Sequence, residues 1–228
     1  KSDRNISVGC SDKDSGCSQT TYAKTFNTST KVGKITIKDN AGNTKNCNVD
    51  TYVDKNKPTI SYSVYKIDGN GNRIAGYNPG DWSRNSIKRE LYPNDTGGSG
   101  IKKTQYSNDN ITWYDENNVA SWIFGGDGVN DTYFRVIDNA GNISDTIHFV
   151  LKVDKTAPSC SGTSGESTTW TSSDRYITVK CSDSTSGCTQ GSYGTNYNWT
   201  VKKDKIKIYD NAGNHSDCEV NVYVDKTP

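Results

Sequence analysis

Apolar and polar residues alternate along short runs of the chain, so that every second residue in a run is apolar. A period of two predicts a β-strand with one buried face, whereas an amphipathic helix would repeat every three to four residues. No segment shows sustained helical spacing, and we therefore expect an all-β protein. The clearest runs are Ile6 and Val8, Ile35 and Ile37, Phe134 and Val136, Ile177 and Val179, Ile206 and Ile208, and Val220, Val222 and Val224.

The run Asp-Asn-Ala-Gly-Asn occurs three times and shows that the chain repeats one unit. It begins at Asp39, Asp138 and Asp210, and each copy is followed by Val-Asp-Lys and then a proline. The first and last copies align without a gap at an offset of 171 residues. These matches predict three modules, at residues 1–57 (repeat 1), 58–157 (repeat 2) and 158–228 (repeat 3). Because a catalytic site is usually a single constellation, motifs that recur in every copy favour a protein that is not an enzyme.

Each Asp-Asn-Ala-Gly-Asn run lies between two predicted strands, and its residues are those of a tight turn. Asp and Asn side chains bond to nearby backbone groups, and Gly adopts a left-handed conformation without steric cost. We therefore expect this run to join the last two strands of each module. The final strand should end before Pro58, Pro158 or Pro228, because proline has no amide hydrogen for a strand ladder. With no Gly/Ser spacer between modules, we expect stiff junctions and a rod on the order of 80 Å long.

Composition and charge exclude several classes of function. The chain has 228 residues, 31% of them hydrophobic, and a net charge of +1. Such a balance gives no electrostatic reason to bind nucleic acid or an anionic membrane surface, and no apolar run reaches the roughly 18 residues of a membrane span. The chain as given shows no signal peptide or anchor motif. Modules of this size bury only about 60% of their unfolded surface, so they need reinforcement.

Seven cysteines supply that reinforcement and indicate an oxidising, extracellular compartment. Repeat 3 has four cysteines, repeat 1 has three, and repeat 2 has none. The position in repeat 1 that would match the first cysteine of repeat 3 falls before Lys1. We therefore expect repeat 1 to be truncated at its N-terminus, without its first strand. The preferred pairs are Cys10 with Cys17, Cys160 with Cys218 and Cys181 with Cys188, which leaves Cys47 unpaired.

An alternative connectivity, which joins Cys160 to Cys181 and Cys188 to Cys218, stays open at the level of sequence. On the preferred scheme, loop-closure entropy assigns roughly 4 kcal/mol to the long loop and roughly 2.5 kcal/mol to the short one. A zinc site is disfavoured, because six residues separate Cys10 from Cys17 and zinc motifs usually place two to four between paired ligands.

The ordered motifs together resemble the tandem bacterial immunoglobulin-like repeats of secreted and cell-surface proteins of the adhesin type. The motifs are Trp, a strand, Ser-Asp-x-x-Ser-Gly-Cys, further strands, Asp-Asn-Ala-Gly-Asn, a strand, and Val-Asp-Lys-Thr-x-Pro. The resemblance covers essentially the whole chain. It implies three tandem immunoglobulin-like β-sandwich modules, with the tryptophan and the tyrosine of each module in a core between two sheets. The cysteines do not occupy the inter-sheet positions of antibody domains.

Aspartates recur in every copy and are candidates for a calcium site at the module junctions. Calcium takes six to eight oxygen ligands, and several carboxylates near one junction could supply some of them. Related repeats bind calcium at linkers similar to Asp-x-Thr-x-Pro. The alternative is that these side chains only close turns, and no cofactor is then required. The candidates are Asp12, Asp39, Asp54, Asp95, Asp138, Asp154, Asp183, Asp210 and Asp225.

Repeat 2 is larger than the others, and its insertions carry extra aromatic residues. Aromatic side chains on a surface bind sugar rings and protein partners, whereas the same side chains inside would only cover the larger core. The candidate binding residues are Tyr77, Trp113, Tyr114, Trp122 and Phe124.

The main hypothesis is a non-catalytic stalk or adhesin segment of a bacterial extracellular or cell-surface protein, which spaces or presents a binding tip. One alternative is a module centred on repeat 2 that binds a host or matrix glycan or protein. Another is a set of accessory domains of a secreted polysaccharide-active enzyme. None of these hypotheses involves nucleic acid or membrane insertion.

Overall fold

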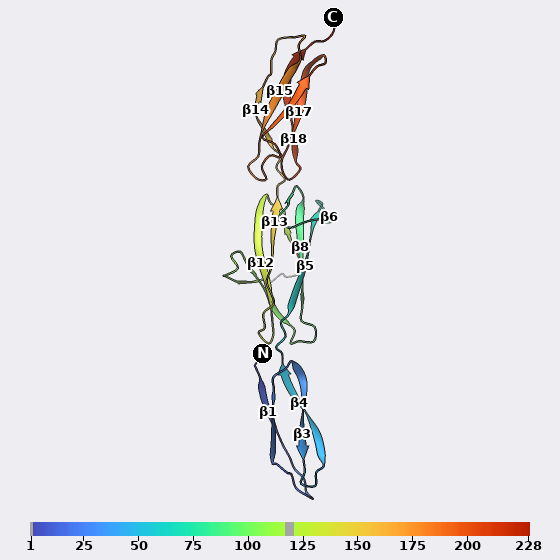
Figure 1. Cartoon of the computed structure of the whole chain (residues 1–228), viewed down its shortest axis with the longest axis vertical. Coiled ribbons are helices and arrows are strands. Elements are labelled where there is room, and N and C mark those ends of the chain that lie inside the picture. The colour runs from blue at the N-terminus through green and yellow to red at the C-terminus, as the bar shows by residue number, and fades with distance from the viewer. Residues whose placement is uncertain (1, 117–120) are drawn as a thin grey trace. The chain divides into compact units, whose positions relative to one another are not determined.

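The computed structural model describes residues 2–116 and 121–228, and within them it contains strands, turns and loops but no helix. The predicted all-β class is confirmed (Figure 1). None of the described residues forms a helix long and apolar enough to cross a membrane. Repeat 1 contains β1 (Arg4–Gly9), β2 (Thr21–Phe26), β3 (Thr30–Lys38) and β4 (Thr44–Val53). Repeat 3 contains β14 (Ser159–Ser164), β15 (Arg175–Ser182), β16 (Ser192–Tyr197), β17 (Val201–Tyr209) and β18 (His215–Val224).

Repeat 2 has more strands, because its insertions form short strands of their own. They are β5 (Thr59–Ile67), β6 (Arg73–Gly76), β7 (Trp82–Ser83), β8 (Ser86–Asn94), β9 (Ile101–Ser107), β10 (Tyr114–Glu116), β11 (Ser121–Phe124), β12 (Gly128–Asp138) and β13 (Ile147–Val153). They form a five-stranded sheet in the order β10-β9-β12-β13-β7 and a four-stranded sheet in the order β11-β8-β5-β6. β7 runs parallel to β13, with Trp82 opposite Lys152.

The chain divides into two compact units whose boundaries differ from the predicted modules. Unit 1 comprises Lys1–Tyr62, Leu91–Ala120 and Thr132–His148, and unit 2 comprises Ser63–Glu90, Ser121–Asp131 and Phe149–Pro228. Repeat 1 lies in unit 1 and repeat 3 in unit 2, whereas repeat 2 contributes to both units. The three-module division therefore stays a prediction.

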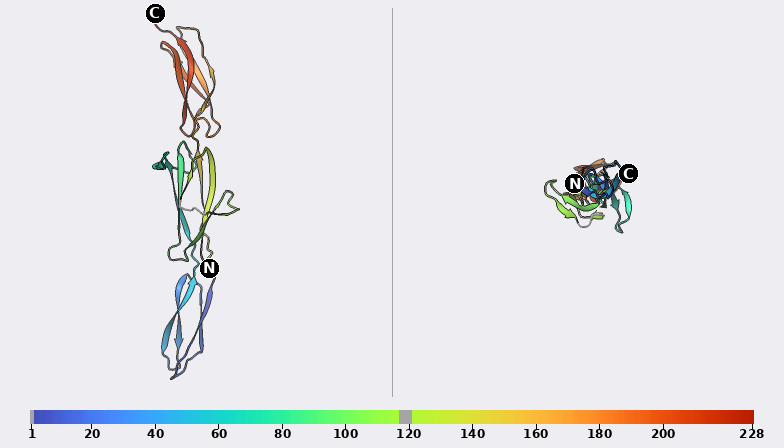
Figure 2. Two further views of the ribbon diagram at one scale, coloured as in Figure 1. Left: turned by 180° about the vertical axis from the view of Figure 1, so that it is seen from behind. Right: turned by 90° about the horizontal axis from the view of Figure 1, so that it is seen from below.

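Repeats 1 and 3 use the same strand pairings, as the constant offset between their sequences predicts. β1 pairs with β2 from Arg4 opposite Phe26, and β15 pairs with β16 from Arg175 opposite Tyr197. The β3–β4 and β17–β18 hairpins also share one register and one β-bulge. Both hairpins can be followed in Figure 2, in blue for β3–β4 and in red for β17–β18.

Each Asp-Asn-Ala-Gly-Asn run connects two strands, as predicted. Its glycine has a positive φ in every copy, 97° at Gly42, 87° at Gly141 and 89° at Gly213. A residue with a Cβ would be strained there, so the motif needs glycine at this position. The first Asp of each run lies at the end of a strand (Asp138) or directly after it (Asp39 and Asp210), and accepts a hydrogen bond from the amide of the run's last Asn.

The core of repeat 3 is well covered. Ile177, Val179, Ile208, Val222 and Val224 are each 0% exposed, and Tyr193 packs against this cluster. The tryptophan that the resemblance implied for the core is instead at the surface. Trp170 is 51% exposed and contacts the ring of Tyr223 edge-on at 5.1 Å. Short aliphatic residues on β15, β17 and β18 fill the interior without it.

Candidate functional site

Six of the nine candidate aspartates form two triads of carboxylates. One triad consists of Asp54, Asp95 and Asp138 and lies in unit 1; the other consists of Asp154, Asp183 and Asp210 and lies in unit 2. Within each triad, one carboxylate oxygen from every residue lies within 4.8 Å of the others. Each triad combines the Asp that ends one repeat with two Asp residues of the next repeat.

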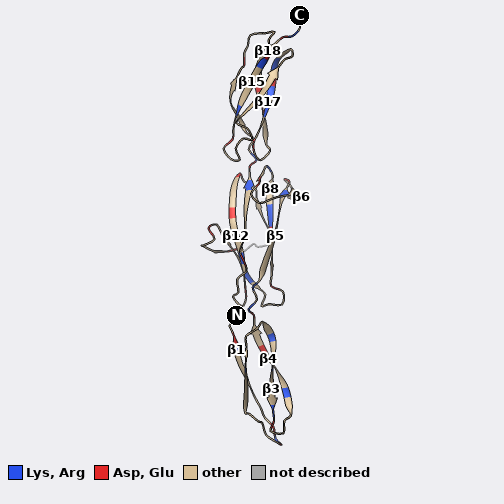
Figure 3. Cartoon of the chain, in the orientation of Figure 1, with Lys and Arg blue, Asp and Glu red and all other residues tan. Residues whose placement is uncertain are grey.

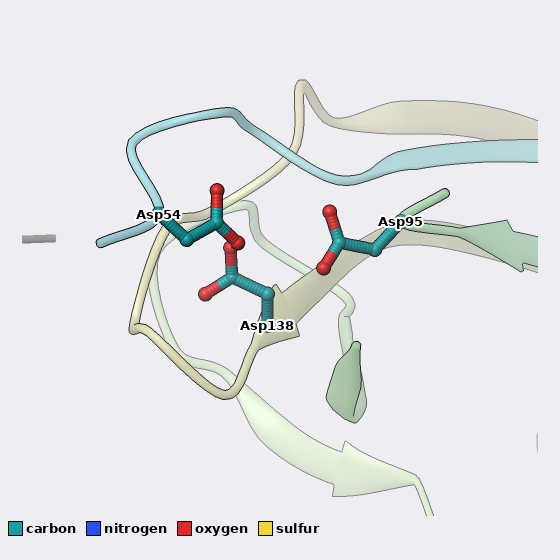
Figure 4. A group of neighbouring side chains, drawn as sticks. All are labelled: Asp54, Asp95 and Asp138. Atoms are coloured by element: carbon teal, nitrogen blue, oxygen red, sulfur yellow. The ribbon is translucent and has the colours of Figure 1, made fainter. Parts of the chain in front are cut away.

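Figure 4 shows the three side chains of the first triad pointing toward one another. Asp54 follows β4, Asp95 follows β8, and Asp138 ends β12. Asp54 is 5% exposed and Asp138 is 0% exposed, so two of the three carboxylates are buried.

Backbone amides hold the carboxylates of the first triad. The Ser99 amide donates to Asp54 Oδ2 at 2.6 Å, and the Gly100 amide donates to Asp95 Oδ2 at 2.7 Å. The Asn142 amide donates to Asp138 Oδ1 at 2.7 Å. All three donors are uncharged, so they orient the carboxylates without neutralising them.

The second triad repeats this arrangement. The Ser186 amide donates to Asp154 Oδ2 at 3.0 Å, and the Gly187 amide donates to Asp183 Oδ1 at 2.8 Å. The Asn214 amide donates to Asp210 Oδ1 at 2.8 Å. Two triads built from equivalent donors indicate one recurring site.

An asparagine side chain ties each triad to the preceding linker. Asn142 Nδ2 donates to Asp138 Oδ2 at 2.7 Å and to the Asp54 carbonyl at 3.1 Å. Asn214 Nδ2 donates to Asp210 Oδ2 at 2.7 Å and to the Asp154 carbonyl at 2.8 Å. The last residue of Asp-Asn-Ala-Gly-Asn thus has a role that reaches beyond its own turn.

The triads lack basic ion-pair partners in the part of the chain that the structure describes. Among the residues that the structure describes, none of the six carboxylates forms an ion pair with Lys, Arg or His. Figure 3 shows that basic and acidic residues are distributed along the chain. Buried charges without a partner are costly, and a bound cation would offset that cost.

The Asp54 carboxyl stays ionised in spite of its surroundings. Burial raises its pKa, but hydrogen bonds from Ser99, Asn56 and Ser29 outweigh burial, so that the pKa is lowered below its ordinary value. A further polar group lies beside the second triad. The hydroxyl of Ser186, a residue only 8% exposed, has no hydrogen-bond partner among the described residues. Hard oxygen donors of this kind are the ligands that calcium prefers.

The remaining three candidates do not join a triad within residues 2–116 and 121–228. Asp12 Oδ1 accepts from the Gly16 amide at 3.2 Å, and Asp39 Oδ1 accepts from the Asn43 amide at 2.7 Å. Asp225 Oδ1 accepts from the Thr227 amide at 2.9 Å. These side chains close turns, as the alternative in the sequence analysis expects, and Asp12 and Asp39 provide a natural comparison for the triads.

The cysteines join in three pairs, and these are the pairs of the preferred scheme. The disulfides are Cys10–Cys17, Cys160–Cys218 and Cys181–Cys188, with Cα–Cα distances of 6.0, 5.9 and 6.1 Å. Cys47 is a free, half-buried thiol.

The five candidate aromatic residues are divided between the two compact units. Trp113 and Tyr114 belong to unit 1, while Tyr77, Trp122 and Phe124 belong to unit 2. Tyr77 is 6% exposed, and its hydroxyl donates to the Asp81 carbonyl at 2.6 Å and accepts from the Lys152 amide at 3.0 Å, so its role is structural.

The other four aromatic residues are accessible to different degrees. Trp113 is half-buried beneath the Arg135 guanidinium, which lies 3.9 Å from the ring centroid, and Tyr114 is 51% exposed. Trp122 is 39% exposed and stacks on Phe124 at a centroid distance of 5.8 Å. The Trp122–Phe124 pair on β11 is therefore the most complete aromatic surface of the five residues.

No family model matches the sequence, and no curated protein matches it. The solved structures that match the chain include two of bacterial proteins. Fibronectin(III)-like modules of CbhA from Clostridium thermocellum align with 64% of this chain and 88% of that one, at 12% identity and a TM-score of 0.30. A structure described as giving insight into host cell surface retention of a 1.5-MDa bacterial ice-binding adhesin aligns with 91% of this chain and 83% of that one, at 13% identity and a TM-score of 0.33. At TM-scores of 0.30 and 0.33, neither likeness carries a conclusion about this chain.

Proposed function

We propose that this chain is a non-catalytic, extracellular structural segment whose consecutive repeats are fastened by calcium at the two carboxylate triads. The observation that carries the proposal is the recurring triad: the Asp that ends one repeat meets two turn Asp residues of the next, without a basic partner among the described residues. A divalent cation there would cross-link the end of one repeat to the start of the next. Such fastening suits a stalk of a cell-surface protein, which holds a binding tip away from its anchor.

Calcium titration of the full chain tests the fastening. At a free calcium concentration of about 100 times Kd, binding to the folded state alone adds about 2.7 kcal/mol per site to the free energy of unfolding. We expect the melting temperature to rise with calcium and to fall with a chelator. The variant Asp138→Asn should lose the calcium-dependent rise in the melting temperature of unit 1. The variant Asp210→Asn should lose the corresponding rise in unit 2.

The matched control is Asp39→Asn, which changes the equivalent residue of repeat 1 outside any triad. We expect this variant to keep the full calcium-dependent shift. A melting temperature that does not differ between calcium and chelator would remove calcium from the proposal. If the double variant Asp138→Asn/Asp210→Asn kept the full calcium-dependent rise in melting temperature, calcium would bind outside the triads.

The stalk itself has a separate test in small-angle X-ray scattering. Three modules end to end would give a maximum dimension on the order of 80 Å or more. If calcium stiffens the junctions, the maximum dimension obtained from the scattering curve should approach that of a rod when calcium is added. A compact particle of the size of one globular domain would contradict the stalk.

A second candidate function has one observation in its favour. Trp122 is 39% exposed and forms a flat aromatic pair with Phe124. Such surfaces bind the apolar faces of sugar rings. A glycan array compared between the native chain and Trp122→Ala would support this role only if the variant lost binding to a specific glycan.

A further inference from the structure

The outward face of β12 in repeat 2 differs in kind from the same face of β17 in repeat 3. On β12, Phe134 and Val136 point into the core, with exposed fractions of 2% and 0%. Successive side chains of a strand alternate between its two faces, so Tyr133 and Arg135 point outward. In repeat 3 the outward face carries two ion pairs, Lys205–Glu219 at 3.7 Å and Lys207–Asp217 at 3.9 Å. Counted back from the Asp-Asn-Ala-Gly-Asn run, Tyr133 stands at the place of the first lysine and Arg135 at the place of the second.

Neighbouring side chains hold the guanidinium of Arg135 in one orientation. It lies over the ring of Trp113, 3.9 Å from the ring centroid, and its Nε donates to Gln105 Oε1 at 2.9 Å. Gln105 is 7% exposed, and its Nε2 donates to Asp115 Oδ1 at 2.8 Å. Lys103 Nζ in turn donates to Asp115 Oδ2 at 2.9 Å. Stacking on one side and a chain of hydrogen bonds on the other therefore fix the guanidinium before a ligand binds.

The positive charge of this guanidinium has no anionic partner in residues 2–116 and 121–228. No described carboxylate forms an ion pair with Arg135. Asp115 is engaged by Lys103 and Gln105 instead. Burial lowers the pKa of the Arg135 guanidinium, as expected for a cation that has lost water without gaining an anion. A fixed guanidinium with both terminal nitrogens available matches the two oxygens of a carboxylate.

A flat aromatic surface lies beside the guanidinium. The ring of Tyr133 stacks on the ring of His148 at a centroid distance of 4.2 Å and an interplanar angle of 14°. β12 and β13, which carry them, are neighbours in the five-stranded sheet, as Figure 1 shows. Tyr133 and Arg135 are two residues apart on one strand, hence about 6.6 Å apart along it. On β9 the residue paired with Tyr133 is Ser107, whose small side chain leaves room beside the ring.

We propose that the outward face of β9, β12 and β13 in repeat 2 binds a carboxylated sugar, of the kind that forms the units of an acidic polysaccharide. The terminal nitrogens of Arg135 donate to the sugar carboxylate, and the apolar face of the sugar ring packs against Tyr133. A neutral sugar would leave the guanidinium without an anion. The charge therefore selects the acidic class.

This site is separate from the features that carry the proposed function. Tyr133, Arg135 and Gln105 belong to unit 1, whereas the Trp122–Phe124 pair belongs to unit 2. The site contains none of the six carboxylates of the triads. Its binding of sugar can therefore be measured in the presence of a chelator, where calcium has no part in the result.

Titration calorimetry of the full chain with tetragalacturonate, in a chelating buffer, tests the site. One comparison ligand is the fully methyl-esterified tetragalacturonate, which keeps the sugar rings and loses the charges. The other is tetraglutamate, which keeps side-chain carboxylates and has no sugar ring. We expect each comparison ligand to bind about tenfold more weakly, or about 1.4 kcal/mol, because each satisfies only one half of the site.

Variants assign the binding to the two halves of the site. Arg135→Lys keeps the positive charge but removes the planar fork, and we expect it to weaken tetragalacturonate binding about tenfold. Tyr133→Leu removes the aromatic ring and should weaken binding about fivefold. The matched control is Lys207→Gln, at the place of Arg135 in repeat 3, which should bind as the native chain does. Trp122→Ala should also bind normally.

Hydrogen exchange on the native chain supplies a readout that needs no variant to fold. Tetragalacturonate should slow amide exchange in β9 and β12 and leave β17 unchanged. The proposal is overturned if tetragalacturonate does not bind at millimolar concentration, or if Arg135→Lys binds it as tightly as the native chain. Equal binding of tetraglutamate would show that the face attracts charge and does not recognise a sugar. Equal binding of the methyl ester would show that Arg135 does not select the ligand.

Discussion

Repeats 1 and 3 share four strands in the same register, yet the core of repeat 3 is closed and that of repeat 1 is partly open. Ile177 and Val179 of repeat 3 are 0% exposed, while Ile6 and Val8 of repeat 1 are half-buried. The strands that carry these residues do not differ in pairing with their hairpin partners. What differs is the covering strand β14 and its disulfide. Strand register in this fold is therefore set by local pattern and turns, whereas closure of the core depends on one additional strand.

The largest expected effect comes from removing the Cys160–Cys218 disulfide, which joins β14 to β18. In the variant Cys160→Ser/Cys218→Ser, we expect repeat 3 to lose about 4 kcal/mol of its free energy of unfolding, because the disulfide closes a loop of 58 residues. The measurement is denaturant unfolding with hydrogen exchange of β15 and β18 as the local readout.

The matched control is Cys47→Ser, which removes a free thiol at the equivalent position and should change stability by less than about 1 kcal/mol. If the two variants lost the same free energy, the disulfide would not be what closes the core of repeat 3.

A core truncation should also distinguish the two repeats. Ile177→Ala removes a fully buried side chain and should cost about 3 kcal/mol, within the usual range for such a cavity. Ile6→Ala at the matched position should cost clearly less, because solvent already reaches part of the side chain. If hydrogen exchange showed that the two variants lose the same local stability, the core of repeat 1 would be closed as well.

Removing the short disulfide should destabilise repeats 1 and 3 by similar amounts. Cys10–Cys17 and Cys181–Cys188 both close loops with a sequence separation of 7. Loop-closure entropy assigns about 2.4 kcal/mol to each. We expect Cys10→Ser/Cys17→Ser and Cys181→Ser/Cys188→Ser to destabilise their own repeats by similar amounts in denaturant unfolding. A large difference would show that the covering strand also supports this loop.

The smallest expected effect is a pH dependence that belongs to unit 1. The pKa of Asp54 is lowered in the folded chain, where hydrogen bonds from Ser99, Asn56 and Ser29 outweigh the opposing effect of burial. The unfolded state therefore binds the proton more readily. The associated stability is present above the unfolded pKa of about 3.9, and it is lost as pH falls through the folded pKa.

Unfolding experiments between pH 2 and pH 6, without calcium, measure this contribution. Asp54→Asn should flatten the acid branch of the stability curve. An unchanged acid branch in this variant would assign the pH dependence to other carboxylates.

Much of the fold could be predicted from the sequence, because its signals are local. Alternation of apolar residues located β1, β3, β15, β17 and β18, and the turn chemistry of Asp-Asn-Ala-Gly-Asn located the hairpins. The prediction of a buried tryptophan is wrong for Trp170, which is 51% exposed. Whether a tryptophan is buried depends on what packs against it and not on its spacing in the repeat. The short strands β6, β7, β10 and β11 lie in insertions that have no counterpart for comparison.

The candidate site was only partly predictable for the same physical reason. All nine aspartates look alike in an alignment of the repeats, because each recurs at its own motif. Which of these carboxylates lie close together depends on where the Asp of a linker lies relative to two turns of the next repeat. Asp54 meets Asp95 and Asp138, whereas Asp12 and Asp39 meet no third carboxylate among the described residues.

The bridging asparagine makes each triad sensitive to chemical ageing. Asn142 Nδ2 contacts both the Asp138 carboxylate and the Asp54 carbonyl, and Asn214 makes the matching pair of contacts. Deamidation would convert this donor into a carboxylate, so that one hydrolysed amide would break two hydrogen bonds and add a fourth negative charge to the cluster. Hydrolysis of either amide would therefore weaken the contact between a linker and the turn that follows it in space.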